Sequence, residues 1–130
     1  MMLAKALLLV EDDAMRRAIS FALEAEGFAA QVCGTGGNLA DDLVGGCDSQ
    51  PACLVVDLGP GAAAEGIEVL RTARRKGSDL PAIVLVTAPS QNLRRTITTL
   101  DAVILEKPLL SGQLVSTVRA LTCSEAGNLP

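Results

Sequence analysis

The sequence predicts a single doubly wound α/β domain, in which a five-stranded parallel sheet is covered by helices on both faces. Two observations lead to this prediction. Five apolar runs of strand length recur along the chain, and stretches with helical spacing of apolar residues separate them. Continuous apolar strands are typical of a parallel sheet buried on both faces, and their alternation with helices indicates βαβ units with right-handed crossovers. No repeat or linker divides the 130 residues, so we expect one core.

The strands are expected at the apolar runs, and the first helix lies between the first two of them. Met15, Ile19 and Leu23 recur there at helical spacing, and Gly27 suits a left-handed C-terminal cap. The five expected strands are 6–10, 29–33, 53–56, 82–86 and 103–105.

Two further helices are expected in the middle of the chain. Asn38 can cap a short helix that contains Leu39 and Leu43. Apolar residues at helical spacing from Ile67 predict the next helix, which should end at Gly77.

The last two helices are expected to begin after serine caps, at Ser90 and Ser111. Three threonines give the first of these two helices a weak intrinsic propensity. We expect residues 1–123 to form the domain and residues 124–130 to form a flexible tail, because nothing apolar remains there to pack. The apolar stripes are Leu93, Ile97 and Leu100 in the first helix and Leu114, Val118 and Leu121 in the second.

Composition excludes several classes of function. Lys and Arg total 11 against 15 Asp and Glu, a net charge of −4, which argues against direct binding of nucleic acid because phosphate contacts need basic surface. No apolar run approaches the about 20 residues of a membrane span. The chain has no histidine, so histidine-based triads and imidazole zinc sites are excluded. The cysteines lack CxxC spacing and the N-terminus lacks a secretory signal, so we expect reduced thiols in a cytoplasmic protein.

Polar residues collect where the predicted strands end, and these ends meet at one edge of a parallel sheet. Clustered carboxylates repel one another unless a cation lies among them, and oxygen ligands without nitrogen or sulfur suit Mg²⁺ or Mn²⁺. Lys107 can hold one phosphoryl oxygen and Thr87 can hydrogen-bond another, so this edge suits transfer of a phosphoryl group to Asp57. The residues concerned are Glu11, Asp12 and Asp13 after the first strand, Asp57 after the third, Thr87 after the fourth, and Glu106 and Lys107 after the fifth.

Several of these residues also have a purely structural interpretation. Asp12 and Asp13 can serve as N-terminal caps, because the first helix begins directly after them. Lys107 alone can be a solvated surface lysine. Asp57 is harder to explain in this way, because it ends an apolar strand and has no helix to cap when the next helix begins only near Glu65.

Four segments, in this order and over nearly the whole chain, resemble the receiver domains of bacterial two-component response regulators. They are LLLVEDD at 7–13, LVVDL at 54–58, VLVTA at 84–88 and EKP at 106–108. The resemblance implies a flavodoxin-like sheet with the strand order 2-1-3-4-5. It also implies a phosphoryl group accepted on Asp57 from a sensor histidine kinase or a histidine phosphotransfer protein. The domain would catalyse its own phosphorylation and slow dephosphorylation, and would signal to a downstream protein or effector domain by a change of conformation.

The resemblance further assigns roles around Asp57, with Mg²⁺ or Mn²⁺ as the cofactor. Asp13 is an alternative to Glu11 in the acidic pair that binds the metal. Lys107 would be the counter-ion of the phosphate, and Thr87 would be the switch hydroxyl. The implied metal ligands are Glu11, Asp12, the Asp57 carboxylate and the backbone carbonyl of Gly59.

The chain departs from the family pattern near Asp57 and at the switch position. Pro60 lies one residue nearer to Asp57, and Gly66 one residue farther, than in the family pattern. Ile104 stands where the family normally has Tyr or Phe.

These departures favour a second hypothesis, a receiver-like interaction module that acts without phosphorylation. A third hypothesis, a magnesium-dependent phosphohydrolase with an aspartyl nucleophile, lacks the second Asp of that class, because Gly59 stands at its position.

The absence of Tyr and Trp also bears on signalling, because no such side chain can move between exposed and buried states. We therefore expect Thr87 to report the phosphate by moving Ala88, Pro89 and the start of the fourth helix. The change should concentrate on the face that the fourth helix, the fifth strand and the fifth helix form.

Overall fold

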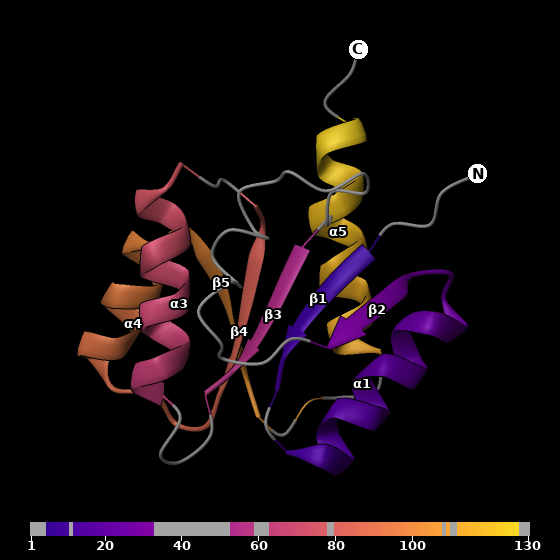
Figure 1. Ribbon diagram of the computed structural model, residues 1–130, viewed down its shortest axis with the longest axis horizontal. Helices are drawn as coiled ribbons and strands as arrows, with labels where there is room; N and C mark the ends of the chain where they lie inside the picture. The colour runs from indigo at the N-terminus through magenta and orange to yellow at the C-terminus, as the bar shows by residue number, and fades with distance from the viewer. Residues whose placement is uncertain are drawn as a thin grey trace.

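Five apolar segments pair as parallel strands in the computed structural model, which describes residues 5–10, 12–32, 53–58, 63–77, 80–107, 109 and 112–127 (Figure 1). The strands are β1 (Lys5–Leu9), β2 (Ala29–Val32), β3 (Cys53–Asp57), β4 (Ala82–Val86) and β5 (Ala102–Glu106). They are hydrogen-bonded in parallel in the order β2-β1-β3-β4-β5. Both the predicted fold class and the predicted strand order are therefore confirmed.

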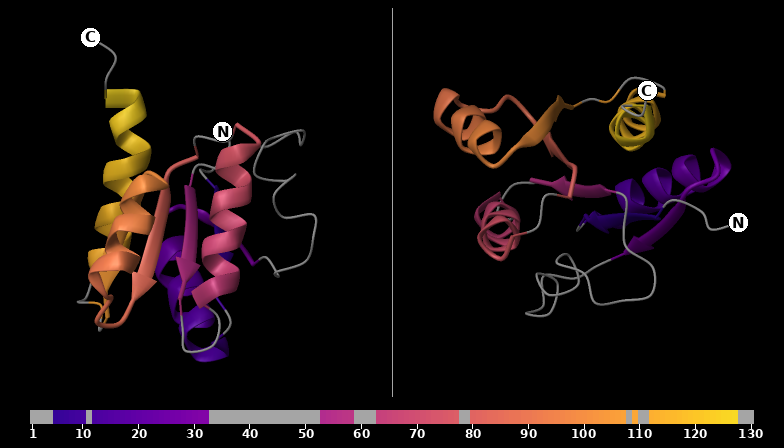
Figure 2. Two further views of the ribbon diagram at one scale, coloured as in Figure 1. Left: turned by 90° about the vertical axis from the view of Figure 1, so that its left-hand side faces the viewer. Right: turned by 90° about the horizontal axis from the view of Figure 1, so that it is seen from above.

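Helices cover both faces of this sheet, with α1 and α5 on one side and α3 and α4 on the other (Figure 2). The short helix expected after Asn38 lies outside the described residues. Helix α5 continues past Ser124, where the flexible tail was expected to begin. Within the described residues, no helix is long and apolar enough to cross a membrane. The helices are α1 (Asp13–Ala25), α3 (Ala63–Arg75), α4 (Gln91–Thr99) and α5 (Gln113–Gly127).

Alternate side chains of the central strands enter two separate cores. Leu54 and Val56 of β3 pack beneath α3 and α4, whereas Cys53 and Val55 pack beneath α1 and α5. Every residue of β3 and β4 is buried, as expected for strands covered on both faces. Burial also raises the pKa of the Cys53 thiol to about 12, so this thiol stays protonated near neutral pH.

Helix ends follow the residues that the sequence placed there. Gly27 after α1 and Gly77 after α3 have φ of +91° and +96°, the left-handed conformation expected of C-terminal caps. Ser90 caps α4, since its hydroxyl oxygen accepts a hydrogen bond from Leu93 N at 3.1 Å.

Gly66 determines how closely α3 approaches β3. A Cβ atom at this position would lie 2.5 Å from Leu58 Cδ2 and 2.9 Å from Val56 Cγ1, closer than van der Waals contact permits. Leu58 directly follows Asp57 and is itself buried. The packing of Gly66 therefore fixes the chain on the C-terminal side of Asp57 against the helix.

Gly66→Ala should lower the free energy of unfolding by about 1–3 kcal/mol, because it forces extra volume into a packed core. This loss is expected even though alanine favours a helix by about 1 kcal/mol over glycine. In a Leu58→Val background, which has no Cδ atom, the same substitution should cost less. Equilibrium urea unfolding of the four proteins measures both effects. A Gly66→Ala protein more stable than the parent would show that α3 has room at this point.

Candidate functional site

Asp57 ends β3 and is the one buried charged residue among the described residues, with 7% of its surface exposed. Its Oδ1 lies 2.5 Å from the Nζ of Lys107, which directly follows β5. Lys107 is held there by the sheet, because its backbone N–H donates to the carbonyl of Val86 at 2.8 Å. The ends of β3, β4 and β5 thus bring together two side chains that are 107 − 57 = 50 positions apart in sequence.

Lys107 neutralises the Asp57 carboxylate but does not complete its hydrogen bonding. Apart from the Lys107 ammonium, no donor among the described residues forms a hydrogen bond with the buried Oδ1. A carboxylate has about four lone-pair sites on its two oxygens, and leaving them unused in a buried position is costly. This atom is therefore suited to an additional cation.

Thr87 directly follows β4, the strand that lies between β3 and β5. It is exposed, and it lines an open groove together with Lys107. The groove has a volume of about 640 Å³, and we call it the α1–α5 groove because Ala18 of α1 and Val115 of α5 contribute to its apolar walls. Thr87 and Lys107 are thus accessible along one continuous surface.

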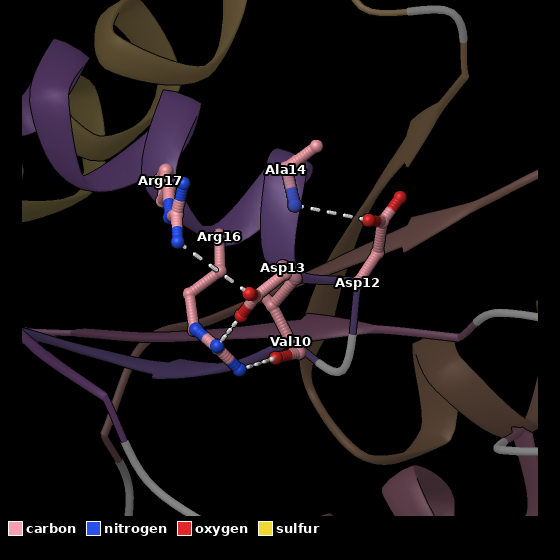
Figure 3. Close-up of polar contacts among 6 residues, drawn as sticks. All are labelled: Val10, Asp12, Asp13, Ala14, Arg16 and Arg17. Atoms are coloured by element: carbon pink, nitrogen blue, oxygen red, sulfur yellow. Dashed lines mark hydrogen bonds and ion pairs between the residues drawn. The ribbon is translucent and has the colours of Figure 1, made fainter.

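The two described aspartates after β1 have different roles at the start of α1 (Figure 3). Asp12 is the N-cap, and its carboxylate accepts a hydrogen bond from Ala14 N at 3.1 Å. Asp13 turns the other way and forms ion pairs with Arg16 and, at 3.7 Å, with Arg17. The structural interpretation of Asp12 as a cap therefore holds, and Asp13 is engaged by its own helix.

The other expected ligands fall partly outside the described residues. Glu11 and Gly59 are not described, whereas Asp12 and Asp57 are. No group of three or more acidic or cysteine side chains that could hold a metal occurs within the described part of the chain. Of the expected metal ligands, the structure therefore describes two, the carboxylates of Asp12 and Asp57.

Glu106 was grouped with these residues because it lies at the end of β5, but its side chain points elsewhere. Its Oε2 lies 2.9 Å from Nη2 of Arg94, in α4. Sequence reasoning missed this arginine, and it also missed Arg16, which donates to the carbonyl of Val10 at 3.3 Å. The spacing of Asp13 and Arg16 is a recognisable helical signal, whereas the contact between Arg94 and Glu106 has no local signature.

Comparisons of sequence find no match among family models or curated proteins. Solved structures do match. A response regulator receiver protein from Burkholderia phymatum is 28% identical, with a TM-score of 0.72 over 92% of this chain and 95% of that one. Full-length FixJ from B. japonicum is 25% identical, with a TM-score of 0.75 over 93% of this chain and 58% of FixJ. A CheY-like receiver domain from Methanospirillum hungatei is 18% identical, with a TM-score of 0.79 over 97% and 98%.

The chain has the fold of a CheY-like response-regulator receiver domain. Its neighbours cover most of its length, in agreement with the resemblance that four short segments indicated. In this receiver fold, Asp57 is the last residue of β3, and Thr87 and Lys107 directly follow β4 and β5 at the same edge of the sheet.

Lys107→Met should lower the free energy of unfolding by about 3 kcal/mol, because it leaves the buried Asp57 carboxylate without its cation. Asp57→Asn removes that charge, so the double variant should recover most of the loss. Thermal and urea unfolding of both single variants and the double variant measure the coupling. Additive losses would show that the two side chains do not stabilise each other.

Asp12→Ala should lower the stability of the metal-free protein by about 1 kcal/mol, because the N-cap of α1 is lost. Asp12→Asn keeps the capping oxygen and should be close to the parent in stability. Both variants lose a carboxylate, so both should bind Mg²⁺ more weakly. Urea unfolding without metal and titration with Mg²⁺ separate the two roles, and full Mg²⁺ affinity in Asp12→Asn would exclude Asp12 from the metal site.

Proposed function

We propose that the chain is a phosphoacceptor receiver, in which Asp57 takes a phosphoryl group and the domain responds by a change of conformation. The buried Asp57 carboxylate carries this proposal. Its Oδ1 lies 2.5 Å from the Lys107 ammonium and has no further hydrogen-bond partner among the described residues. A carboxylate with a purely structural role would be expected to have its hydrogen bonds completed or to be exposed to water.

In the proposed transfer, one carboxylate oxygen of Asp57 forms a bond to phosphorus while the bond from phosphorus to the donor breaks. The donor's leaving atom, an imidazole nitrogen in a phosphohistidine, keeps the electron pair of that bond. The Lys107 ammonium would hold one phosphoryl oxygen, and the Thr87 hydroxyl would donate to another. Water would later attack the acyl phosphate, which restores the carboxylate and releases inorganic phosphate.

A divalent cation, Mg²⁺ or Mn²⁺, belongs to this proposal. The donor set fits it, because Asp57 and Asp12 offer oxygen ligands and the buried Asp57 Oδ1 has no partner besides Lys107 among the described residues. Asp12 can cap α1 and bind a metal together, since a carboxylate has two oxygens. Glu11 and the Gly59 carbonyl are the proposed remaining ligands. A bound cation would neutralise the negative charge that the carboxylate and the phosphoryl oxygens bring together.

The proposed phosphodonor is a sensor histidine kinase or a histidine phosphotransfer protein. The α1–α5 groove supports this proposal, because its apolar walls lead to Thr87 and Lys107. A partner helix seated in the groove could bring its phosphohistidine to Asp57. The output would pass to a downstream protein or effector domain. Two neighbours support this part of the proposal. The match covers only 58% of full-length FixJ, so FixJ contains a further segment beyond its receiver-like part. Another neighbour is the signal receiver domain of a modulated diguanylate cyclase.

A receiver-like module that acts without phosphorylation is the second candidate, and one observation favours it. Ile104, at the expected switch position, is half-buried and packs against the core beneath α3 and α4. An aliphatic side chain in this position offers no aromatic group to signal the state of Asp57.

Incubation of the protein with acetyl phosphate and Mg²⁺ should add the mass of one phosphoryl group, because Asp57 can attack the small donor directly. Asp57→Asn should gain no such mass, and the parent should gain little when the metal is chelated. Intact-mass spectrometry measures all three, with circular dichroism as the control for folding. Equal modification of Asp57→Asn would show that another residue is the acceptor. A folded parent that gains no mass would support the second candidate.

A further inference from the structure

Helix α4 depends on its neighbours for its position. It has nine residues, fewer than an isolated helix needs for stability in water. Three of the nine are threonines, which lower its intrinsic propensity further. Ile97 is its one fully buried apolar anchor. Leu93 and Leu100 pack against the same core in partly buried positions, and polar contacts at the two ends add to this packing.

The contact at the beginning of α4 is the ion pair between Arg94 and Glu106. Nη2 of Arg94 lies 2.9 Å from Oε2 of Glu106, at the end of β5 and directly before Lys107. The two side chains are 44% and 52% exposed, so water and salt screen their attraction. The ion pair is therefore a weak contact, and it adds to the Ser90 cap and to the packing of Leu93 at the same end.

The contact at the other end comes from Arg74 of α3. Its Nε donates to the carbonyl of Leu100 at 2.7 Å, and its Nη2 donates to the carbonyl of Asp101 at 3.3 Å. A cation at the C-terminus of a helix also interacts favourably with the helix dipole. The bond to Leu100 is partly buried, which makes it less accessible to competing water. The bond from Arg74 to Leu100 is therefore harder to break than the exposed ion pair between Arg94 and Glu106.

A short segment connects the beginning of α4 to Thr87. Only Ala88 and Pro89 separate Thr87 from Ser90, the N-cap of the helix. Ala88 has φ of +45°, a left-handed conformation that costs energy for a residue with a Cβ atom. A displacement of Thr87 would therefore be transmitted to the first turn of α4, where Arg94 lies.

We propose that the Arg94–Glu106 ion pair is a releasable latch that holds the first turn of α4 against the end of β5. Arg74 keeps the last turn of α4 in place, so the helix pivots about that end when the latch opens. The trigger rests on the proposed phosphorylation of Asp57, which would draw Thr87 toward a phosphoryl oxygen. The resulting pull acts against the exposed ion pair first, because that contact is the weaker of the two.

The latch can be tested in the unphosphorylated protein by amide hydrogen exchange. Arg94→Gln should speed exchange of the Leu93 amide, which bonds to Ser90, by about 1.4-fold to 5-fold, the range for an exposed ion pair. The amide of Leu100, at the Arg74 end, should exchange as in the parent. Arg95→Gln removes the same charge one position farther along the helix and should change neither amide.

A double-mutant cycle shows whether the effect passes through Glu106. In a Glu106→Gln background, Arg94→Gln should have no further effect on exchange, and the charge-exchanged protein with Arg94→Glu and Glu106→Arg should regain protection. An equal effect of Arg94→Gln in both backgrounds would overturn the latch. Arg94 is the more informative partner, because a change at Glu106 also alters the electrostatic field at the adjacent Lys107.

The coupling to Asp57 is tested by the rate of phosphorylation with acetyl phosphate and Mg²⁺. Opening the latch favours the same conformation that phosphorylation would favour, so Arg94→Gln should be phosphorylated faster than the parent. The increase in rate should not exceed the increase measured in hydrogen exchange. Arg95→Gln should be phosphorylated at the rate of the parent. An unchanged rate together with faster exchange would overturn the coupling. If the parent itself is not phosphorylated, the proposed function fails, whereas the exchange experiments still decide whether the ion pair holds α4.

Discussion

The buried carboxylate of Asp57 is the constraint on which the rest of the site depends. Burying a charge is costly unless a cation is close, and Lys107 provides one at 2.5 Å. Lys107 reaches this place because β5 pairs with β4, with Glu106 opposite Val86. A slip of one residue in this register would turn each side chain to the other face and bring Glu106 toward Asp57 in place of Lys107. Asp57 is therefore neutralised only when the edge strand β5 pairs with β4 in the correct register.

Much of this arrangement could be predicted from the sequence because local patterns encode it. The apolar runs of β3 and β4 are continuous, as strands buried on both faces require, and their ends determine where Asp57 and Thr87 lie. Caps such as Ser90 likewise depend on adjacent residues only. The order of the strands was predicted from the resemblance to receiver domains, because periodicity in a single sequence does not specify which strands become neighbours.

Other features depend on contacts that local patterns do not encode. Glu106 follows the same kind of strand end as Lys107, yet it pairs with Arg94, 12 positions away. The bond from Arg74 to Leu100 spans 26 positions and joins two different helices. Both contacts are made by tertiary packing, which brings together groups that the sequence leaves far apart.

The site thus combines two parts, a rigid sheet and a helix, α4, that can change position more easily. Every side chain of β3 and β4 is buried, and close-packed interiors have few alternative arrangements, so the sheet cannot readily move in response to a new charge at Asp57. Helix α4 differs, because it is short, has one fully buried apolar residue and has an exposed ion pair in its first turn. Regions with few buried contacts open at low free energy. A change of charge at the sheet edge should therefore be expressed in α4, through the short strained segment around Ala88 that joins the two parts.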